Sequence, residues 1–479
     1  MFFEQVIVKH RRIHFVGIGG IGMSGIAEIL LNLGYEISGS DLRRSPITDR
    51  LEQLGATVFE GHVGENIRGA DAVVVSSAIS SANPESLAAR EAKIPIIKRG
   101  ELLAELMRLK YGIAVGGSHG KTTTTSIAGA LLAHAGKDPT VVVGGRVDSF
   151  GSNARLGKSD ILLVEADESD GSFLNLAPIV AVITNVDREH MDHYHDFETL
   201  ESAFVAFADK TPFYGAAILC LDDPILRGLL PKVSRSVRTY GSEERSPDAD
   251  LIACGIKHSH LKSSFRLRRR GGEDLGVFEI AGAGRHNVLN ATAAVSIGLE
   301  LEIAPDVLRE GLKTFSGVDR RFQLKGERGG VSVLDDYGHH PSEIEATLAA
   351  ARTCDFNKVH VIFQPHRYSR THLMEQEFAN CFRDCDTLQV LDIYAASEDP
   401  IPGVNSVNLT ERIRAVGDVD ARYADSIASA IDATVAAAAS GDVIVTLGAG
   451  NVGRIGGQVL EALAGQVSAG TTRHAADGA

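Results

Sequence analysis

Short apolar runs alternate with amphipathic segments along most of the chain. The runs at residues 13–18, 113–115 and 331–334 are rich in β-branched side chains, which favours buried strands. The segments between such runs repeat apolar residues every three or four positions, which indicates helices with one buried face. Strands and helices that alternate in this way form parallel sheets covered by helices. The pattern therefore predicts an α/β protein.

The chain has 479 residues, more than one hydrophobic core usually contains, and the pattern divides it into three domains. We expect an N-terminal Rossmann-like domain over residues 1–108 and a central P-loop ATPase-like domain with a parallel sheet over residues 109–318. A C-terminal Rossmann-like domain would occupy residues 319–479. Small polar residues from Ser468 onward predict an irregular C-terminal tail.

The composition excludes several classes of partner. The formal net charge is −14, and an acidic chain has little non-specific attraction for nucleic acid. No apolar run approaches the ~18 residues that a membrane-spanning helix requires, so no membrane partner is expected. The cysteines number five, which is odd, and this favours reduced thiols and a cytoplasmic protein.

A glycine-rich loop follows the apolar run at 113–115 and opens a helix. It contains Gly116, Gly117, Ser118, His119, Gly120, Lys121, Thr122 and Thr123. Backbone N–H groups at the start of a helix bind phosphate, Lys121 would add a positive charge, and the Thr122 hydroxyl would reach Mg²⁺. The usual P-loop spacing requires glycine at position 115, where this chain has Val115. The loop is therefore tighter than that of an ordinary GTPase or motor ATPase.

A second glycine turn, after the first strand, predicts a site for another nucleotide. Its glycines are Gly17, Gly19, Gly20 and Gly22. Asp41 lies 19 residues beyond Gly22, which fits the dinucleotide fingerprint in which a carboxylate binds a ribose. Ser76 and Ser77 follow another strand at the same edge of the predicted sheet, where serines also serve as helix caps. We expect a nucleotide-diphosphate site in the first domain, separate from the ATP site.

Acidic residues and histidines follow the next strands of the central domain. Glu165 follows the run at 161–164, and a carboxylate at this end of a strand beside a P-loop strand can bind Mg²⁺. His190 is a candidate ligand of a second magnesium ion. The nearby His193 and His195 suggest a zinc site, but the HExxH and HxHxDH patterns are absent.

Two asparagines and a polar crevice complete the candidate residues. Asn287 and Asn290 follow a glycine turn, and they either contact adenine or cap a helix. In the C-terminal domain, two strand ends carry aspartate, tyrosine, histidine and arginine side chains. Arginines bind carboxylates through two hydrogen bonds, so this crevice suits a zwitterion. Its side chains are Asp336, Tyr337, His339, His340, Arg367 and Arg370.

These motifs stand in the order found in the Mur ligases, which the chain resembles from about residue 11 to residue 460. The resemblance lies in the segments 17–22, 116–122, 164–170, 184–192, 284–287, 336–341 and 366–368. The variants look like the branch that joins L-alanine to UDP-N-acetylmuramate. Some relatives carry a carbamylated lysine just beyond the His-Met-Asp segment, but residues 204–209 contain no lysine here. We therefore do not expect that modification.

The resemblance implies a role for each candidate residue. The catalytic residues would be Lys121, Glu165, His190, His339 and His340. Two Mg²⁺ ions, or Mn²⁺ in their place, would bind Thr122, Glu165 and His190. ATP would contact residues 116–123 together with Asn287, Asn290, Arg320 and Asp336. The UDP-sugar would contact Gly17, Gly19, Gly20, Gly22, Asp41, Ser76 and Ser77, and the amino acid would contact Tyr337, His339, Arg367 and Arg370.

The implied reaction is an ATP-dependent ligation in peptidoglycan synthesis. The lactyl carboxylate of UDP-N-acetylmuramate would attack the γ-phosphate of ATP, and L-alanine would then displace phosphate through a tetrahedral intermediate. His339 or His340 would accept the proton of the amine. The family implies a cytoplasmic bacterial enzyme, monomeric or homodimeric, that serves cell-wall biogenesis, cell shape and cell division.

Three alternatives use the same residues differently. A ligase of the same family could add a preformed peptide to the same sugar nucleotide. An NAD-dependent oxidoreductase would use the first glycine turn, but the P-loop and the predicted magnesium ligands would then have no function. A non-catalytic nucleotide-binding regulator would not require the crevice that contains the arginines.

Overall fold

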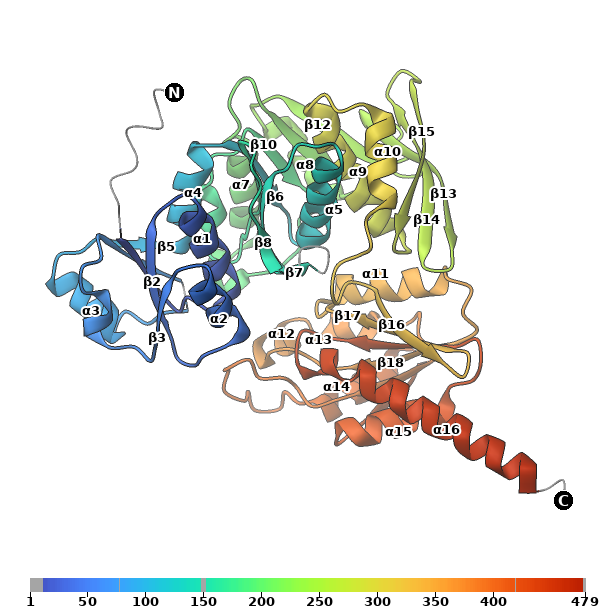
Figure 1. Cartoon of the computed structure of the whole chain (residues 1–479). Helices are drawn as coiled ribbons and strands as arrows, with labels where there is room; N and C mark the ends of the chain where they lie inside the picture. Colours follow the sequence, from blue (N-terminus) through green and yellow to red (C-terminus); the bar gives the residue numbers. More distant parts are fainter. Residues whose placement is uncertain (1–11, 77, 148–151, 418, 477–479) are drawn as a thin grey trace. The chain divides into compact units, whose positions relative to one another are not determined.

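The computed structural model describes residues 12–476, except 77, 148–151 and 418 (Figure 1). The chain divides into two compact units. The first unit comprises Met1–Cys254, Arg266–Phe278 and Leu289–Phe315, and the second comprises Gly255–Phe265, Glu279–Val288 and Ser316–Ala479. The described residues form three sheets.

The first sheet is parallel and has the strand order β3-β2-β1-β4-β5. Its strands are β1 (Arg12–Val16), β2 (Glu36–Asp41), β3 (Thr57–Glu60), β4 (Ala72–Val75) and β5 (Ile96–Lys98). Its helices are α1 (Ile21–Asn32), α2 (Pro46–Gln53), α3 (Pro84–Glu91) and α4 (Arg99–Arg108), with the 3₁₀ turn η1 (Gly64–Ile67). The strand order reverses at β1 and β4, and parallel sheets bind ligands at the carboxyl edge of such a point.

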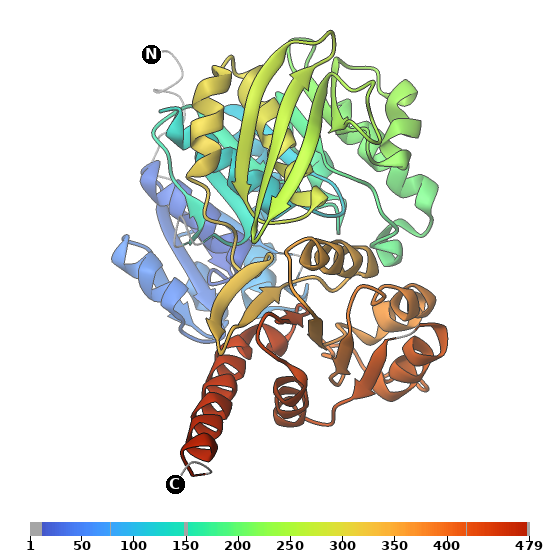
Figure 2. The same cartoon turned by 90° about the vertical axis from the view of Figure 1, so that its right-hand side faces the viewer.

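The second sheet has the strand order β15-β14-β13-β12-β11-β10-β6-β9-β7-β8. Its strands are β6 (Tyr111–Gly116), β7 (Thr140–Val147), β8 (Ser152–Arg155), β9 (Ile161–Glu165), β10 (Val180–Ile183), β11 (Ala216–Cys220), β12 (Val237–Ser242), β13 (Leu251–Ser259), β14 (Lys262–Arg269) and β15 (Asp274–Ala281). The neighbouring strands β12, β11, β10, β6, β9 and β7 are parallel to one another, whereas β8 pairs antiparallel to β7. Figure 2 shows β13, β14 and β15 side by side in yellow-green.

Helices and 3₁₀ turns connect the strands of this sheet. They are α5 (Lys121–His134), η2 (Ser172–Asn175), α6 (Met191–Tyr194), α7 (Phe197–Ala208), α8 (Pro224–Leu229), η3 (Leu230–Lys232), α9 (Arg285–Glu300) and α10 (Pro305–Lys313). The central strand β6 is short and apolar, and its residues Ile113, Ala114 and Val115 have no exposed surface. A strand that is buried on both faces has a continuous apolar sequence, so the apolar run at 113–115 was enough to predict this strand.

The third sheet has the strand order β16-β17-β21-β18-β19-β20, with β16 antiparallel to β17 and the other pairs parallel. Its strands are β16 (Gln323–Arg328), β17 (Val331–Asp336), β18 (Val359–Phe363), β19 (Thr387–Val390), β20 (Asp420–Tyr423) and β21 (Val443–Leu447). Its helices are α11 (Pro341–Arg352), α12 (Tyr368–Leu373), α13 (Glu375–Asn380), α14 (Ser406–Val416), α15 (Ile427–Ala437) and α16 (Gly456–Ala476), with the 3₁₀ turn η4 (Asn451–Arg454).

The two faces of the third sheet bury separate apolar clusters. Leu334 packs with Ile344 and Leu348 of α11, whereas its neighbour Val333 packs with Val459 and others on the opposite face. Successive residues of a strand point to opposite faces, so helices on both sides are needed to cover them. The face-by-face packing fixes which strand residues reach the carboxyl edge.

The predicted α/β class with parallel sheets is confirmed, with one sheet in each of the three predicted stretches. The boundaries at residues 108 and 318 stay predictions. The predicted irregular tail from Ser468 is wrong, because α16 continues to Ala476. Within the described part of the chain, no helix combines the length and apolarity needed to span a bilayer.

Candidate active site

The glycine-rich loop joins β6 to α5 in the middle of the second sheet, where β6 lies between β9 and β10. Gly120 is the N-cap of α5 and has φ 80°, a left-handed conformation that glycine adopts without steric cost. The first turn of this 14-residue helix leaves backbone N–H groups without helical partners, and they carry the positive end of the helix dipole. This geometry suits a phosphate group.

The start of the loop packs directly against the end of β10. Gly117 has φ 127°, and a Cβ atom there would overlap Thr184 Oγ1 and lie 2.9 Å from the Thr184 nitrogen. The Thr184 hydroxyl and the Asn185 side-chain amide donate to the His119 carbonyl at 2.6 and 3.0 Å. The His119 N–H in turn donates to Asn185 Oδ1 at 2.8 Å. The tight spacing of the loop is therefore fixed by its contacts with the neighbouring strand.

Lys121 is the first residue of α5, and its ammonium group is largely buried. It donates to the carbonyls of Gly117 and Ser118 at 2.6 and 3.0 Å and to Glu168 Oε1 at 2.8 Å. Burial lowers the pKa of Lys121, but Glu168 raises it, and the net value lies above the usual one. Burial raises the pKa of Glu168 to about 7, although Lys121 lowers it. The two loop carbonyls and Glu168 therefore hold the lysine cation in place.

Thr122 lies beside Glu165 at the carboxyl end of β9. The Thr122 hydroxyl lies 2.9 and 3.0 Å from the two carboxylate oxygens of Glu165. The sequence placed both residues near a magnesium ion, and the structure brings them together. A hydroxyl and a carboxylate are oxygen ligands of the kind that Mg²⁺ prefers.

A second group of possible metal ligands lies next to Lys121. Glu168, Glu189 and His190 each offer one ligand atom, and these atoms lie within 4.8 Å of one another. His190 has φ 56° and lies 3.6 Å from Glu168 Oε1 through its Nε2 atom. Non-glycine residues in this conformation are uncommon and cluster at functional sites. Two carboxylates and an imidazole fit a divalent cation such as Mg²⁺ or Mn²⁺.

Asn290 lies behind the loop. Its Oδ1 atom accepts a hydrogen bond from the Thr124 hydroxyl at 3.2 Å, and a Cβ atom on Gly120 would lie 2.5 Å from it. Asn290 thus packs against the start of α5, and its predicted contact with adenine stays a prediction. The predicted partner Asn287 belongs to the second unit, where its amide donates to the Ala283 carbonyl at 2.8 Å.

The predicted UDP-sugar residues gather at the carboxyl edge of the first sheet. Gly17 has φ 77°, Gly20 is the N-cap of α1, and the Gly19 N–H donates to Asp41 Oδ2 at 2.9 Å. Ser76 directly follows β4. Ser77 lies outside the described residues. Asp41 thus holds the turn itself with one of its oxygens.

Arg99 is a neighbour of this turn that no sequence motif indicated. A Cβ atom on Gly22 would lie 3.2 Å from the Arg99 guanidinium, which also lies 4.0 Å from Asp167 of the second sheet's acidic loop. Arg99 begins α4, about 80 residues from the glycine turn, and nothing in local spacing links the two. The start of α1 therefore has a positive side chain beside it.

In the second unit, Asp336 and Arg320 hold the loop after β17. Asp336 accepts hydrogen bonds from the N–H groups of Phe322 and Gly338 at 2.6 and 2.7 Å, and burial raises its pKa to about 6. Arg320 pairs with Asp335 at 3.1 Å and donates to the Gly448 carbonyl. Its guanidinium lies 5.0 Å from the centre of the Tyr337 ring.

The predicted amino-acid residues form a connected group of rings and arginines. The His339 ring lies 5.2 Å from Tyr337 and 5.5 Å from His366. Arg370 Nη1 lies 3.5 Å from His366 Nδ1. Arg367 has φ 72° and is half exposed, with Glu398 3.9 Å away. The sequence identified both arginines but did not predict His366 as the residue that joins them to His339.

The two adjacent histidines are held in different ways. His339 Nδ1 lies 3.1 Å from the Tyr337 carbonyl, which can only accept, so Nδ1 carries the proton and Nε2 is the basic nitrogen. His340 Nδ1 accepts from the Ser342 N–H at 3.4 Å and caps α11, so its proton is on Nε2. His340 is buried, whereas His339 is partly exposed.

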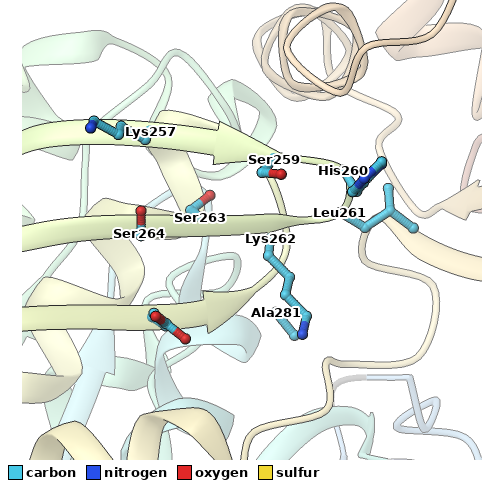
Figure 3. Close-up of a pocket in the computed structure, with 9 residues that line it drawn as sticks. Lys257, Ser259, His260, Leu261, Lys262, Ser263, Ser264 and Ala281 are labelled. Carbon is cyan, nitrogen blue, oxygen red and sulfur yellow. The ribbon is translucent and has the colours of Figure 1, made fainter.

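A separate pocket of about 600 Å³ lies at the ends of β13, β14 and β15 (Figure 3). Its lining includes Lys257, Lys262 and Glu279 but none of the predicted site residues. Figure 3 shows the two lysines extending in different directions rather than converging on one point. The pocket gives no indication of a ligand.

Three models of the Mur ligase family match successive parts of the chain. The model described as the catalytic domain matches residues 12–111, the middle domain matches 115–298, and the glutamate ligase domain matches 320–450. The chain belongs to the Mur ligase family. This confirms the resemblance inferred from the ordered motifs.

Close relatives carry the name of one branch of the Mur ligases. The chain is 59% identical over 463 residues to the UDP-N-acetylmuramate–L-alanine ligase of Solibacter usitatus, covering 96% of this chain and 97% of the relative. It is 57% identical over 463 residues to the enzyme of that name in Koribacter versatilis, covering 96% and 98%.

Solved structures of other Mur ligases have a similar fold. The crystal structure of UDP-N-acetylmuramate-alanine ligase MurC from Thermotoga maritima aligns with a TM-score of 0.77 at 27% identity, covering 94% of this chain and 99% of that one. The murein peptide ligase of Psychrobacter arcticus aligns with a TM-score of 0.66 at 23% identity, covering 95% and 99%. The second likeness shows the fold alone.

Replacing Gly117 by alanine should abolish the tight loop. The new Cβ atom would overlap Thr184 and disfavour φ 127°, so we expect ATP affinity to fall at least tenfold in a titration of the purified variant. Gly136→Ala is the control, because Gly136 also has a positive φ of 72° but no atom lies within 4 Å of its Cβ position. Equal ATP affinity of the Gly117 variant and the wild type would contradict the steric argument.

Proposed function

We propose that this Mur ligase joins L-alanine to the lactyl carboxylate of UDP-N-acetylmuramate in an ATP-dependent reaction of peptidoglycan synthesis. The observation that carries the proposal is the ammonium of Lys121, held at the N-terminus of α5 beside Glu168 and near the Thr122–Glu165 pair. The names of the relatives that are 50–59% identical support the choice of substrates. We place the enzyme in the bacterial cytoplasm, as a monomer or homodimer.

The first chemical step joins two anions. The lactyl carboxylate attacks the γ-phosphorus of ATP, the bond to the β–γ bridging oxygen breaks, and ADP leaves while an acyl phosphate forms. Lys121 would exchange its contacts with Glu168 and the loop carbonyls for contacts with phosphate oxygens. The N–H groups at the start of α5 would bind the same phosphates. These groups offset the repulsion between the reactants.

The acidic residues around Lys121 would hold the divalent cations. Thr122 and Glu165 form one candidate ligand set, and Glu168, Glu189 and His190 form the other. When bound, Mg²⁺ or Mn²⁺ would neutralise phosphate charge and polarise the phosphoryl group. The ligand sets also explain why this loop contains more carboxylates than a single lysine needs.

The second step requires a neutral amine. The alanine nitrogen attacks the acyl carbon, and the tetrahedral intermediate expels inorganic phosphate. We assign the deprotonation of the ammonium to His339, whose Nε2 is the basic nitrogen, rather than to His340, whose Nδ1 caps α11. Arg367 and Arg370 would hold the alanine carboxylate.

The UDP-sugar site is assigned to the glycine turn of the first sheet. The N–H groups at the start of α1 and the guanidinium of Arg99 suit a diphosphate. A ligase that adds a preformed peptide would share this site, since it would use the same sugar nucleotide. The relatives at 50–59% identity favour L-alanine as the second substrate.

Phosphate release tests the proposal directly. Purified enzyme with ATP and UDP-N-acetylmuramate should release phosphate with L-alanine and much more slowly with glycine, serine or a tripeptide. Release that does not depend on the sugar nucleotide would contradict the ligase assignment. Faster release with the tripeptide than with L-alanine would instead support the peptide-adding branch.

Lys121→Ala should abolish turnover and leave sugar-nucleotide binding nearly intact. We assign the lysine to the ATP phosphates and the UDP-sugar to the first sheet. Calorimetric titration with UDP-N-acetylmuramate should give a dissociation constant within about twofold of the wild type. Parallel loss of turnover and sugar-nucleotide binding would show that the two sites are not separate.

His339→Gln should slow the second step alone. Loss of a general base typically costs about 10²–10⁴-fold in rate, so alanine ligation should fall by that factor. Hydroxylamine is neutral at pH 7 and needs no base, so the variant should still form the hydroxamate from the acyl phosphate. His340→Asn, which preserves a capping side chain, should keep alanine ligation near the wild-type rate. Equal loss of hydroxamate and alanine ligation in His339→Gln would contradict the assignment.

A further inference from the structure

A fully buried carboxylate lies in the first sheet's domain, apart from every residue assigned above. Glu85 is in the first turn of α3, and its side chain has no exposed surface. Buried carboxylates are rare unless they are paired and hydrogen-bonded, so the groups that surround this one are informative.

Four side chains from separate segments face the Glu85 carboxylate. Asn66 donates to Oε1 and Ser40 donates to Oε2, both at 2.6 Å. His62 Nδ1 lies 3.2 Å from Oε2, and the buried His14 Nε2 lies 3.6 Å from Oε1. Burial raises the pKa of Glu85, but the neighbouring His14 and the hydrogen bonds from Ser40 and Asn66 outweigh it and hold the pKa below its usual value. The carboxylate therefore accepts hydrogen bonds from β2 and η1, and it lies against histidines of β1 and of the loop after β3.

The same segments hold the glycine turn. The Ser40 carbonyl accepts hydrogen bonds from the N–H groups of Gly17 and Ile18 at 2.8 and 2.9 Å. The next residue, Asp41, accepts from Gly19 through its carboxylate and from Gly61 through its carbonyl, at 2.9 and 2.7 Å. One strand end thus holds the turn with its backbone while the Ser40 hydroxyl fixes that strand end to Glu85.

We propose that Glu85 is a positioning residue for the sugar-nucleotide site, acting through Ser40 on the glycine turn at residues 17–20. The inference rests on the proposed function, which assigns UDP-N-acetylmuramate to this turn. Glu85 sets the spacing between the ends of β2 and β3 and the start of α3. The N–H groups of the turn are used by these internal hydrogen bonds, and the turn places the start of α1, whose N–H groups would face the diphosphate, only while the Ser40 carbonyl stays in place.

Glutamine cannot replace this carboxylate, although it has almost the same shape. The carboxylate accepts from donors on both of its oxygens, whereas a glutamine amide has one accepting oxygen and an NH₂ group that only donates. If the NH₂ group faced Asn66, two donors would oppose each other in a buried site. If it faced Ser40, the Ser40 hydroxyl would have to reverse, accept from residue 85 and donate to His62 instead. Neither orientation keeps the two charge-assisted hydrogen bonds of the carboxylate.

Glu85→Gln tests the proposal by separating binding from catalysis. In calorimetric titrations, the affinity for UDP-N-acetylmuramate should fall at least tenfold, the cost of losing about one buried charge-assisted hydrogen bond. The KM for the sugar nucleotide should rise in proportion, while kcat at saturation and the KM values for ATP and L-alanine stay within about threefold of the wild type. Ser40→Ala, which removes the link but leaves Glu85, His62 and Asn66, should weaken sugar-nucleotide binding about threefold to tenfold.

Asp442→Asn is the matched control for stability. Asp442 is buried in the third sheet, pairs with the buried His360 at 3.0 Å and accepts from the Lys358 and Ala439 N–H groups. Its variant should lower the melting temperature without changing sugar-nucleotide affinity. If Glu85→Gln behaves in the same way, Glu85 is structural only and the proposal is overturned.

The other possible outcomes also bear on the proposal. If Glu85→Gln does not fold, Ser40→Ala becomes the test variant. Wild-type affinity for UDP-N-acetylmuramate in folded Ser40→Ala would then overturn the proposal. If the wild type itself does not bind UDP-N-acetylmuramate, the proposed function fails and this inference falls with it. Wild-type binding with unchanged affinity in both variants would overturn only the role of Glu85.

Discussion

A lysine cation held in a nearly dry site is the constraint on which the central sheet depends. Lys121 must stay charged to attract a phosphate group, yet burial disfavours its charged form. Two loop carbonyls and Glu168 compensate, and Glu168 is buried in turn. Removing one member would leave the other charge unpaired, which is far more destabilising than replacing both. The strands β6 and β9 must therefore present their ends side by side.

The tight loop follows from the same packing. Gly117 packs against Thr184 at the end of β10, and Gly120, the last glycine of the loop, lies against Asn290 of α9. A side chain at either glycine would overlap a neighbour. A strand end and a helix thus crowd the loop from two sides, which agrees with its shortened spacing. This loop is one of the ordered motifs on which the resemblance to the family rests.

The glycine turn of the first sheet is also held in place by polar groups, but it contains no lysine. Its N–H groups are held by backbone and carboxylate acceptors at the end of β2, and the buried Glu85 ties that strand end to α3. In both sheets, the chemistry sits at the carboxyl edge, where side chains follow strands whose positions are fixed by the apolar core. In both, a buried carboxylate stabilises the loop: Glu168 pairs with Lys121, and Glu85 accepts from Ser40 and Asn66. Polar networks of this kind hold a geometry only while every member is satisfied.

The sequence alone determined the α/β class, the two glycine loops, Lys121, Thr122, Glu165 and the order of motifs that places the chain among the Mur ligases. These features are local: apolar runs, glycine spacing and the residues that directly follow strands are all readable within a few positions. The tertiary structure decided which distant side chains join them. Glu168, Arg99, His366 and Glu85 gained their roles from strands and helices that meet only after folding, and a charged residue in a loop looks the same in sequence whether it is solvated or buried. The choice between His339 and His340 was also tertiary, because the proton position of each imidazole depends on whether a carbonyl or an N–H group faces it.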